Sequence, residues 1–206
     1  IPSKALINAA STLDKARRAA EYGLTFDGLK VDMVKLVEWK NGVVKRLTGG
    51  IGQLLKMAGV TVIQGTGTFL APTTLEVKGA AGTDTVDATD VVISRPIEIP
   101  GFKPDGKRVL DSTGALDLTA APKRVVVIGG GYIGLELGIY LSKMGSEVTI
   151  VELTAGLLPG QDPDLVKIVE RSLKKRKVRI LLETGAKSWK DGRDGAVITV
   201  QTKKGE

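Results

Sequence analysis

Apolar residues in the first quarter of the chain recur at the three- and four-residue spacing of a helix. This pattern predicts one helix over residues 1–22 and a second over residues 31–57. Glycines interrupt the second pattern, and each costs about 1 kcal/mol relative to alanine inside a helix. We therefore expect a break or bend in the second helix near Gly49 and Gly50.

The pattern then changes to short runs of β-branched residues separated by turn residues, which is typical of strands. The strands expected from these runs are 60–64, 65–69, 74–78, 83–87 and 90–94. Prolines at 96, 100 and 104 then indicate an extended connector and a candidate domain boundary. A short helix or turn is expected over residues 111–118.

The stretch 124–152, RVVVIGGGYIGLELGIYLSKMGSEVTIVE, has the clearest pattern in the chain. Its apolar opening, residues 124–128, predicts a buried parallel strand, and residues 147–151 predict a second one. The helix expected between them has apolar positions at Ile133, Leu137, Leu141 and Met144. Gly145 supplies a C-terminal stop for that helix.

Three glycines follow the first strand of this stretch at GxGxxG spacing. Gly129 permits a tight turn, Gly131 lets the backbone approach a pyrophosphate, and Gly134 lets the helix pack closely on the strand. Glu152 ends the second strand, where its carboxylate can accept hydrogen bonds from a ribose. Strand, glycines, helix, strand and acid occur in the required order, so the stretch predicts dinucleotide binding rather than an ordinary βαβ turn.

The residues around Glu152 also predict which dinucleotide binds. The helix N-terminus can hold the pyrophosphate through backbone N–H groups and its dipole, without a basic side chain. Glu152 would repel a 2′-phosphate, and residues 153–155 include no arginine to receive one. NAD is therefore favoured over NADP.

Beyond Glu152 the sequence continues to alternate between helix and strand patterns, as expected for an α/β protein. Asp162 and Pro163 are a suitable N-cap and first position for a helix that reaches residue 177. Strands are expected at 178–182 and 196–202. The sequence ends before the last parallel strand that a complete nucleotide-binding domain would need.

Composition limits the other functions that the chain could have. Its 206 residues are 42% hydrophobic, with no apolar run as long as a membrane span and no signal peptide, which is typical of a soluble globular protein. The net charge of +7 comes partly from residues 174–179, where cations complement a helix C-terminus. With only 4% aromatic residues there is little for bases to stack on, so nucleic-acid binding is not expected.

Cysteine and histidine are both absent from the sequence. Within these residues this excludes disulfides, thiol nucleophiles, imidazole acid–base chemistry and most zinc sites. No metal site and no catalytic residue is therefore predicted in the chain.

Several motifs, in order along the chain, give it a family resemblance. They are IPSKAL at the start, GTGTF at 65–69, RPIEIPGF at 95–102, LDSTGAL at 110–116, GGGYIGLELG at 129–138, and VTIVE followed by LLPGQDPDL at 157–165. With these motifs the chain resembles the dihydrolipoamide dehydrogenases of the pyridine nucleotide-disulfide oxidoreductase family, over essentially all 206 residues.

The resemblance implies a fold and an activity. The fold would be α/β with two Rossmann-like βαβ domains, both incomplete here: a partial FAD-binding domain over residues 1–121 and an NAD-binding domain over residues 122–206. The activity would be oxidation of protein-bound dihydrolipoamide through a redox disulfide and FAD, with hydride transfer to NAD. A homodimer would serve the lipoyl domain of a 2-oxo acid dehydrogenase complex, in the cytoplasm or, in a eukaryote, the mitochondrial matrix. Neither nucleic acid nor membrane would be a partner.

The resemblance also implies roles for single residues. Lys4 would lie beside the flavin ring, Gly67 at the adenine end of FAD, and Ser94 in a turn next to the flavin. Tyr132 and Ile133 would border the nicotinamide pocket. The remaining cofactor-binding positions are the turn residues Gly129, Gly130, Gly131 and Gly134, Glu136 near the nicotinamide, Glu152 at the ribose, and Ala186, whose backbone would hold the adenine.

Some features depart from the family pattern. The family's redox cysteines and His-Glu pair have no counterpart here. Ile93 runs directly into Ser94, where the family has three more residues.

Other interpretations stay open at this point. Lys4 could be a solvated helix residue, Ile133 an ordinary core position, and Glu136 a helix carboxylate with a local partner. The activity could be that of another disulfide reductase, of the glutathione or mercuric reductase type, although Glu152 argues against the NADPH-dependent ones. The lack of cysteine and histidine would also suit a non-catalytic NAD-binding module.

Overall fold

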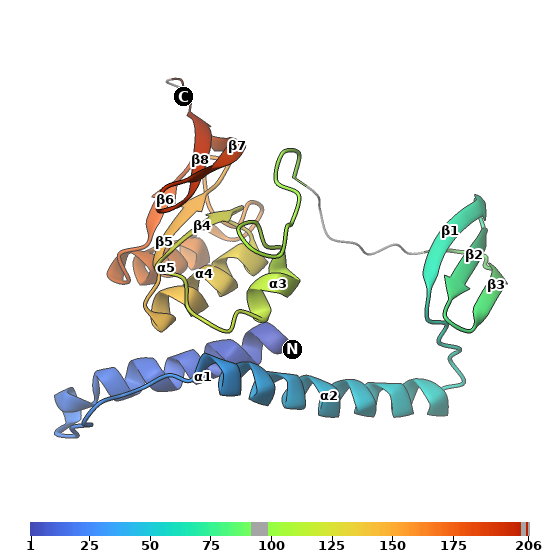
Figure 1. Cartoon of the computed structure of the whole chain (residues 1–206), viewed down its shortest axis with the longest axis horizontal. Coiled ribbons are helices and arrows are strands. Elements are labelled where there is room, and N and C mark those ends of the chain that lie inside the picture. Colours follow the sequence, from blue (N-terminus) through green and yellow to red (C-terminus); the bar gives the residue numbers. More distant parts are fainter. Residues whose placement is uncertain (92–98, 203–204, 206) are drawn as a thin grey trace. The chain divides into compact units, whose positions relative to one another are not determined.

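The computed structural model describes residues 1–91, 99–202 and 205 (Figure 1). Its elements, in chain order, are α1 (Pro2–Arg17), the 3₁₀ helix η1 (Ala19–Tyr22), α2 (Met33–Met57), β1 (Thr66–Ala71), β2 (Thr74–Gly79), β3 (Gly82–Asp87), α3 (Ser112–Leu116), β4 (Arg124–Ile128), α4 (Tyr132–Met144), β5 (Glu147–Val151), α5 (Pro163–Lys175), β6 (Arg179–Leu181), β7 (Thr184–Gly192) and β8 (Gly195–Thr202). The chain is α/β, as the sequence predicted.

The chain divides into two compact units. One is formed by residues 1–44 together with residues 99–206, and the other by residues 45–98. The predicted boundary between a flavin part and a nucleotide part near residue 121 stays a prediction. In the described part of the chain, no helix is long and apolar enough to cross a membrane.

The smaller unit contains an antiparallel sheet in the order β1-β2-β3, with Thr66 opposite Lys78 and Thr74 opposite Asp87. The predicted strands at 65–69, 74–78 and 83–87 are confirmed. The strand predicted at 60–64 is wrong, because these β-branched residues have no ladder partner in the described structure. Most of the strand expected at 90–94, with the Ile93–Ser94 junction, lies outside the described residues.

The break predicted in the second helix is also wrong. α2 runs without interruption from Met33 to Met57, through Gly49 and Gly50. A glycine lowers helix propensity but keeps its backbone N–H, so the hydrogen-bond ladder can continue through it. The low helix propensity of glycine was therefore not enough to interrupt α2.

The larger unit contains a parallel sheet in the order β4-β5-β6, with α4 and α5 as its crossover helices (Figure 1). Arg124 lies opposite Glu147, and Thr149 lies opposite Arg179. α4 ends at Gly145, whose φ of 106° closes the helix in the left-handed conformation, as predicted. The predicted N-cap of α5 is confirmed as well, since Asp162 accepts a hydrogen bond from the Asp164 N–H at 2.8 Å.

An antiparallel hairpin of β7 and β8 completes the described part of this unit. The sequence predicted β8 but missed β7, whose residues TGAKSWKDG carry no alternating apolar pattern. β7 is a strand because it pairs with β8, and its composition alone does not favour a strand.

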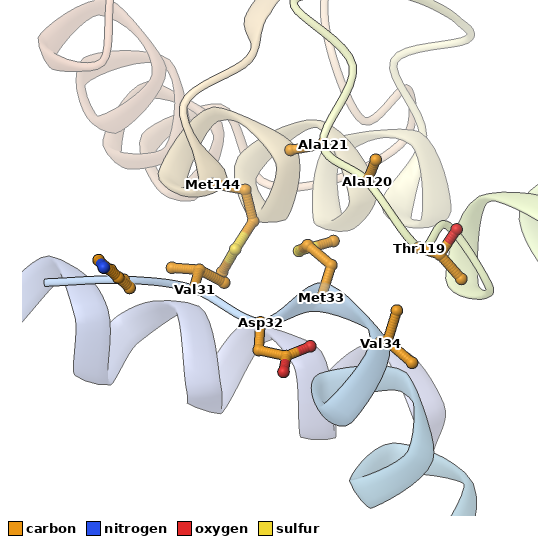
Figure 2. Close-up of a pocket in the computed structure, with 9 residues that line it drawn as sticks. Val31, Asp32, Met33, Val34, Thr119, Ala120, Ala121 and Met144 are labelled. Carbon is orange, nitrogen blue, oxygen red and sulfur yellow. The ribbon is translucent and has the colours of Figure 1, made fainter.

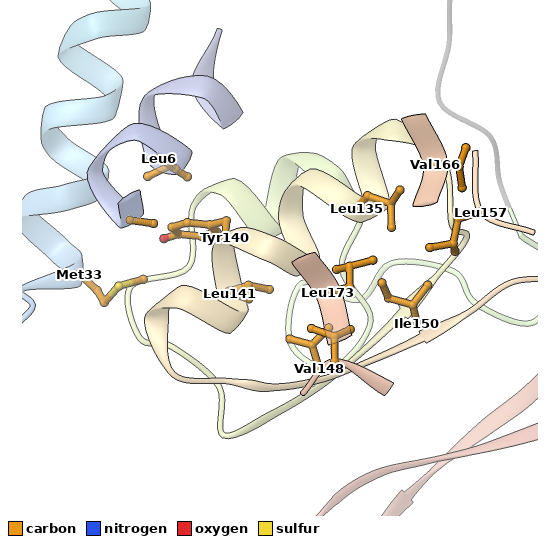
Figure 3. Close-up of a cluster of buried hydrophobic side chains, with 12 residues drawn as sticks. Leu6, Met33, Leu135, Tyr140, Leu141, Val148, Ile150, Leu157, Val166 and Leu173 are labelled. Atoms are coloured by element: carbon orange, nitrogen blue, oxygen red, sulfur yellow. The ribbon is translucent and has the colours of Figure 1, made fainter. Parts of the chain in front are cut away.

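The core of the larger unit lies where α4 meets α1 on one side and β5 and α5 on the other (Figure 3). Each fully buried aliphatic side chain contributes about 1.5–3 kcal/mol through removal from water. The labelled members of this cluster are Leu6, Met33, Leu135, Tyr140, Leu141, Val148, Ile150, Leu157, Val166 and Leu173. The first helix of the chain is therefore fixed onto the helix that follows the glycine motif.

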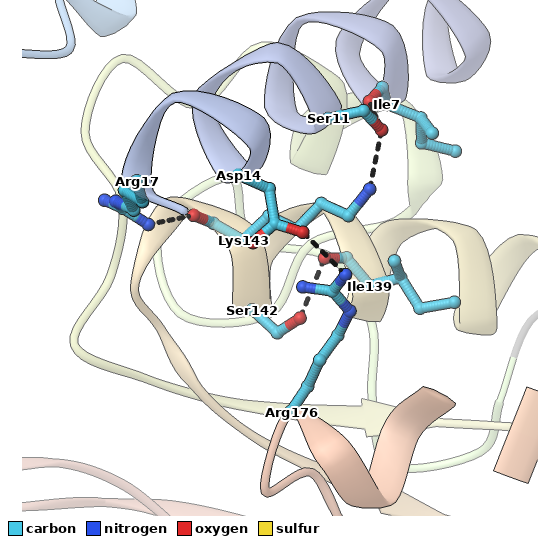
Figure 4. A network of polar contacts seen from close by, with 8 residues as sticks. All are labelled: Ile7, Ser11, Asp14, Arg17, Ile139, Ser142, Lys143 and Arg176. Carbon is cyan, nitrogen blue, oxygen red and sulfur yellow. Dashed lines mark hydrogen bonds and ion pairs between the residues drawn. The ribbon is translucent and has the colours of Figure 1, made fainter. Parts of the chain in front are cut away.

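A polar network joins the same helices along one edge of this contact (Figure 4). Asp14 of α1 accepts a hydrogen bond from Nη2 of Arg176 at 2.8 Å, and this bond is the main cause of the lowered pKa of Asp14. Lys143 of α4 donates from Nζ to the Ser11 hydroxyl at 2.6 Å, and its own carbonyl accepts from Arg17 at 2.7 Å.

We expect Asp14→Asn to destabilise the protein by about 1–2 kcal/mol, because it leaves the partly buried Arg176 guanidinium without its counter-charge. Lys167→Gln is the matched control, since it breaks an exposed ion pair with Asp164 that is worth less than about 0.5 kcal/mol. Denaturant midpoints of the two variants measure the difference. Equal midpoints would contradict a stabilising role for the Asp14–Arg176 pair.

Candidate dinucleotide-binding site

The glycine-rich turn joins β4 to α4 at the carboxyl edge of the parallel sheet. Gly129 has a φ of 105°, and its N–H donates to the carbonyl of Val151 at 2.8 Å. A Cβ on Gly134 would lie 2.2 Å from the carbonyl oxygen of Gly129 and 3.1 Å from Cγ1 of Val127. The structure thus gives Gly129 and Gly134 the turn and packing positions that the spacing predicted.

Gly131 has different surroundings. It is the N-cap of α4, its φ of −80° is open to any residue, and no side chain caps the helix there. A Cβ on Gly131 would have no other atom within 4 Å. The N-cap position of α4 is therefore uncovered at Gly131, and the N–H groups and dipole of a helix N-terminus can hold an anion there.

Glu152 directly follows β5, and its side chain turns back to the glycine-rich turn. It is only 7% exposed, and its Oε2 accepts from the Gly130 N–H at 2.6 Å. Its Oε1 accepts from the N–H and from the hydroxyl of Thr154, both at 2.7 Å. The predicted acid is therefore next to the predicted turn, in a fixed orientation.

These contacts shift the pKa of Glu152. Burial raises its pKa, but the hydrogen bonds from the Thr154 and Gly130 N–H groups and from the Thr154 hydroxyl outweigh burial and lower the pKa overall. The stabilisation from these bonds is therefore present above the ordinary carboxyl pKa of 4.5 and is lost as the pH falls through the lowered value. Glu152 is a carboxylate at neutral pH.

We expect Glu152→Ala to weaken NAD binding by about 1–3 kcal/mol, because the ribose loses a charged acceptor. Titration calorimetry with NAD, on a variant whose melting temperature is checked, measures this loss. Glu147→Ala, which removes an exposed acid at the other end of the same strand, is the control. NAD affinity that stays unchanged in the Glu152 variant would refute the assignment.

Lys4 and Glu136 were predicted separately, and the structure brings them together. The Lys4 ammonium forms an ion pair with Oε1 of Glu136, between α1 and α4. The hydrogen bond from Lys4 is the main cause of the lowered pKa of Glu136. The Lys4 side chain is 68% exposed, so it is a solvated helix residue that also has a specific partner. The partner of Glu136 comes from a different helix, α1, and is not local in sequence.

Tyr132 and Ile133 lie in the first turn of α4 and are 61% and 62% exposed. The core position considered for Ile133 is therefore wrong, because the buried face of this helix is formed by Leu135, Leu137 and Leu141 instead. Two exposed apolar side chains beside the open helix N-terminus are available to contact a ligand.

Ala186 lies in β7, which begins next to Glu152. The Thr184 N–H donates to the Glu152 carbonyl at 2.9 Å, and the Glu183 N–H donates to the Thr154 carbonyl at 2.9 Å. These bonds place the start of β7 beside the loop that follows Glu152. The predicted adenine contact at Ala186 is two residues further along this strand.

The other predicted flavin contacts have less structural support. Gly67 lies in β1, and a Cβ there would make an ordinary contact of 3.6 Å with Leu75, so no close backbone approach explains the glycine. Ser94 lies outside the described residues. Their roles rest on the resemblance.

A pocket in the larger unit is separate from this site (Figure 2). It is lined by Val31, Met33, Ala121 and Met144 among others. Met144 is at the C-terminal end of α4, about 20 Å along the helix axis from the glycine-rich turn at 1.5 Å per residue. The pocket is therefore not part of the dinucleotide site.

Comparisons with known proteins agree with the geometry. The family model described as pyridine nucleotide-disulphide oxidoreductase matches residues 1–206. The chain is 40% identical to a dihydrolipoyl dehydrogenase of Geobacillus stearothermophilus over 204 residues, covering 98% of this chain and 43% of that protein. It is 41% identical to the enzyme of that name from Bacillus subtilis, covering 98% of this chain and 44% of that protein.

Solved structures show the same likeness. The crystal structure of LpdA from Mycobacterium tuberculosis matches with a TM-score of 0.81 at 26% identity, covering 100% of this chain and 46% of that one. The flavoprotein disulfide reductase RclA of Escherichia coli matches with a TM-score of 0.68 at 26% identity, covering 97% of this chain and 42% of that one. The chain thus spans less than half the length of the relatives that it matches.

Proposed function

The chain belongs to the pyridine nucleotide-disulphide oxidoreductase family, as its motifs predicted, and we propose that it is a segment of a dihydrolipoyl dehydrogenase that uses FAD and NAD. The observation that carries this choice within the family is Glu152, an ionised and buried carboxylate at the position predicted for the ribose contact. A 2′-phosphate placed there would face a fixed negative charge, which favours NAD over NADP.

The residues of the site fit NAD through four separate features. The open space at Gly131 admits a pyrophosphate to the N–H groups of α4, and Glu152 can accept from the adenosine ribose. Tyr132 and Ile133 would border the nicotinamide, and the backbone at Ala186 would hold the adenine. When bound, FAD and NAD would supply the electron and hydride transfer, which is the chemistry of the cofactors.

The Lys4–Glu136 pair is the contribution of this chain at the place where the two cofactors would meet. Its two charges compensate each other, so each would keep a counter-charge if a cofactor covered this partly exposed pair. Because Lys4 belongs to α1 and Glu136 to α4, the pair would also position the flavin side of the protein against the nicotinamide side. Gly67 and Ser94 would contribute further flavin contacts.

The remaining parts of the proposal concern the whole protein. Residues 1–121 would be part of the FAD-binding domain, and residues 122–206 would be the NAD-binding domain without its last strand. The redox disulfide and the His-Glu pair would come from sequence outside this chain. The protein would be a cytoplasmic homodimer that oxidises the lipoyl domain of a 2-oxo acid dehydrogenase complex.

The test is an assay of the purified full-length flavoprotein with dihydrolipoamide and either NAD or NADP. We expect reduction of NAD to be much faster than reduction of NADP. NADPH-dependent reduction of glutathione disulfide or of mercuric ion would instead identify another member of the family. NAD binding without any disulfide chemistry would favour a non-catalytic nucleotide-binding module.

A further inference from the structure

Thr154, two residues after the ribose-binding acid, holds that acid through two donors. Its backbone N–H and its hydroxyl both contact Oε1 of Glu152 at 2.7 Å. The same hydroxyl lies 2.8 Å from the carbonyl oxygen of Gly156. Both neighbours of the hydroxyl are acceptors, and a threonine hydroxyl has a single proton to donate.

The number of acceptor sites on Glu152 limits how many hydrogen bonds a bound ribose could donate to it. A carboxylate offers about four lone-pair positions, and three of them receive the Gly130 N–H, the Thr154 N–H and the Thr154 hydroxyl. Two ribose hydroxyls donating to Glu152 would need one position more than remains. The Thr154 hydroxyl can release that position without losing its own hydrogen bond, because the Gly156 carbonyl is already within reach.

Resting on the proposed NAD function, we propose that Thr154 is a positioning residue for nucleotide specificity. Without nucleotide, its hydroxyl holds Oε1 of Glu152. With NAD bound, the hydroxyl donates to Gly156 instead, and a ribose hydroxyl takes its place on the carboxylate. The Thr154 N–H stays on Oε1 in both arrangements, so the carboxylate keeps its orientation throughout.

The backbone around Thr154 supports this role, because it fixes the position of the hydroxyl. The Thr154 carbonyl accepts from the Glu183 N–H at 2.9 Å, and the Leu158 N–H donates to the Gly130 carbonyl at 3.0 Å. The loop is thus tied to β7 on one side and to the glycine-rich turn on the other. A carboxylate held by such a loop cannot turn away from a 2′-phosphate, and this maintains the discrimination against NADP.

The test compares Thr154→Val, which removes only the hydroxyl, with Thr154→Ser, which keeps it. Dissociation constants for NADH and NADPH are measured on the full-length flavoprotein by calorimetry, across a range of pH. For Thr154→Val we expect the Kd for NADH to fall about 3- to 10-fold, because the acceptor position that the hydroxyl fills without nucleotide is then free. The Kd for NADPH should change less, because its adenosine ribose has one hydroxyl fewer to donate. Losing one hydrogen bond raises the pKa of Glu152, so the acid-side loss of NADH affinity should also begin at a higher pH.

Thr154→Ser should match the wild type in both constants and in the pH profile, because its hydroxyl can make the same bonds. Unchanged NADH and NADPH constants in Thr154→Val, with Glu152→Ala still defective, would overturn the role of Thr154 and leave the proposed function standing. A serine variant whose constants and pH profile change in the same way as those of the valine variant would also overturn it. A wild-type protein that binds NADPH more tightly than NADH would overturn the proposed cofactor and this inference together.

Discussion

Gly131→Val is expected to abolish NAD binding while the fold stays intact. A Cβ at this position would meet no protein atom within 4 Å apart from its chain neighbours, and the φ of −80° suits valine. The same open space is where the pyrophosphate would contact the helix N-terminus, so the valine methyl groups would exclude it. The cost to folding is the weaker N-cap, at most about 1 kcal/mol.

The measurement is a titration of the full-length flavoprotein with NAD, together with thermal unfolding. Gly42→Val is the matched control, because its surroundings in α2 are equally open and it lies in no proposed site. We expect no detectable NAD binding in the Gly131 variant and normal binding in the control. Normal NAD binding by a folded Gly131→Val protein would contradict the placement of the pyrophosphate.

Gly134→Ala, unlike Gly131→Val, is expected to destabilise the fold itself, by about 2–4 kcal/mol. NAD binding should be lost as a consequence of this destabilisation. The added Cβ would lie 2.2 Å from the Gly129 carbonyl oxygen, a backbone atom that cannot move without opening the turn. α4 would have to separate from β4, and the core contacts of Leu135 would loosen with it.

Gly138→Ala, one turn further along the same helix, is the control for this prediction. Its added Cβ would make only ordinary contacts, the nearest at 3.6 Å to Val148, and alanine has the better helix propensity. We expect this variant to be as stable as the wild type or slightly more stable. Equal melting temperatures for the Gly134 and Gly138 variants would show that the close approach of α4 to β4 is not needed.

The stretch 124–152 could be predicted from the sequence because each of its signals is local. An apolar strand, glycines at fixed spacing and a helix ending at Gly145 are all read within a few residues of one another, and the structure has these elements with nearly the same bounds. The neighbouring positions of Glu152 and the glycine-rich turn follow from the parallel pairing of β4 with β5.

Features that depend on distant partners could not be predicted in the same way. β7 has a polar sequence and is a strand because β8 pairs with it, whereas residues 60–64 have strand-like composition and no partner in the described structure. The Lys4–Glu136 pair joins residues that are far apart in the sequence. Each could be predicted as a site residue, but the contact between them could not. Thr154 has no spacing signal at all, and only the geometry of its hydroxyl identifies it.

The central claim, that the glycine-rich turn and Glu152 form an NAD site, is tested most directly by a crystal structure of the full-length flavoprotein with NAD bound. We predict that the pyrophosphate lies against the N–H groups at the start of α4, in the space at Gly131, and that the adenosine ribose donates to Glu152. NAD bound elsewhere, or a ribose that makes no contact with Glu152, would contradict the account.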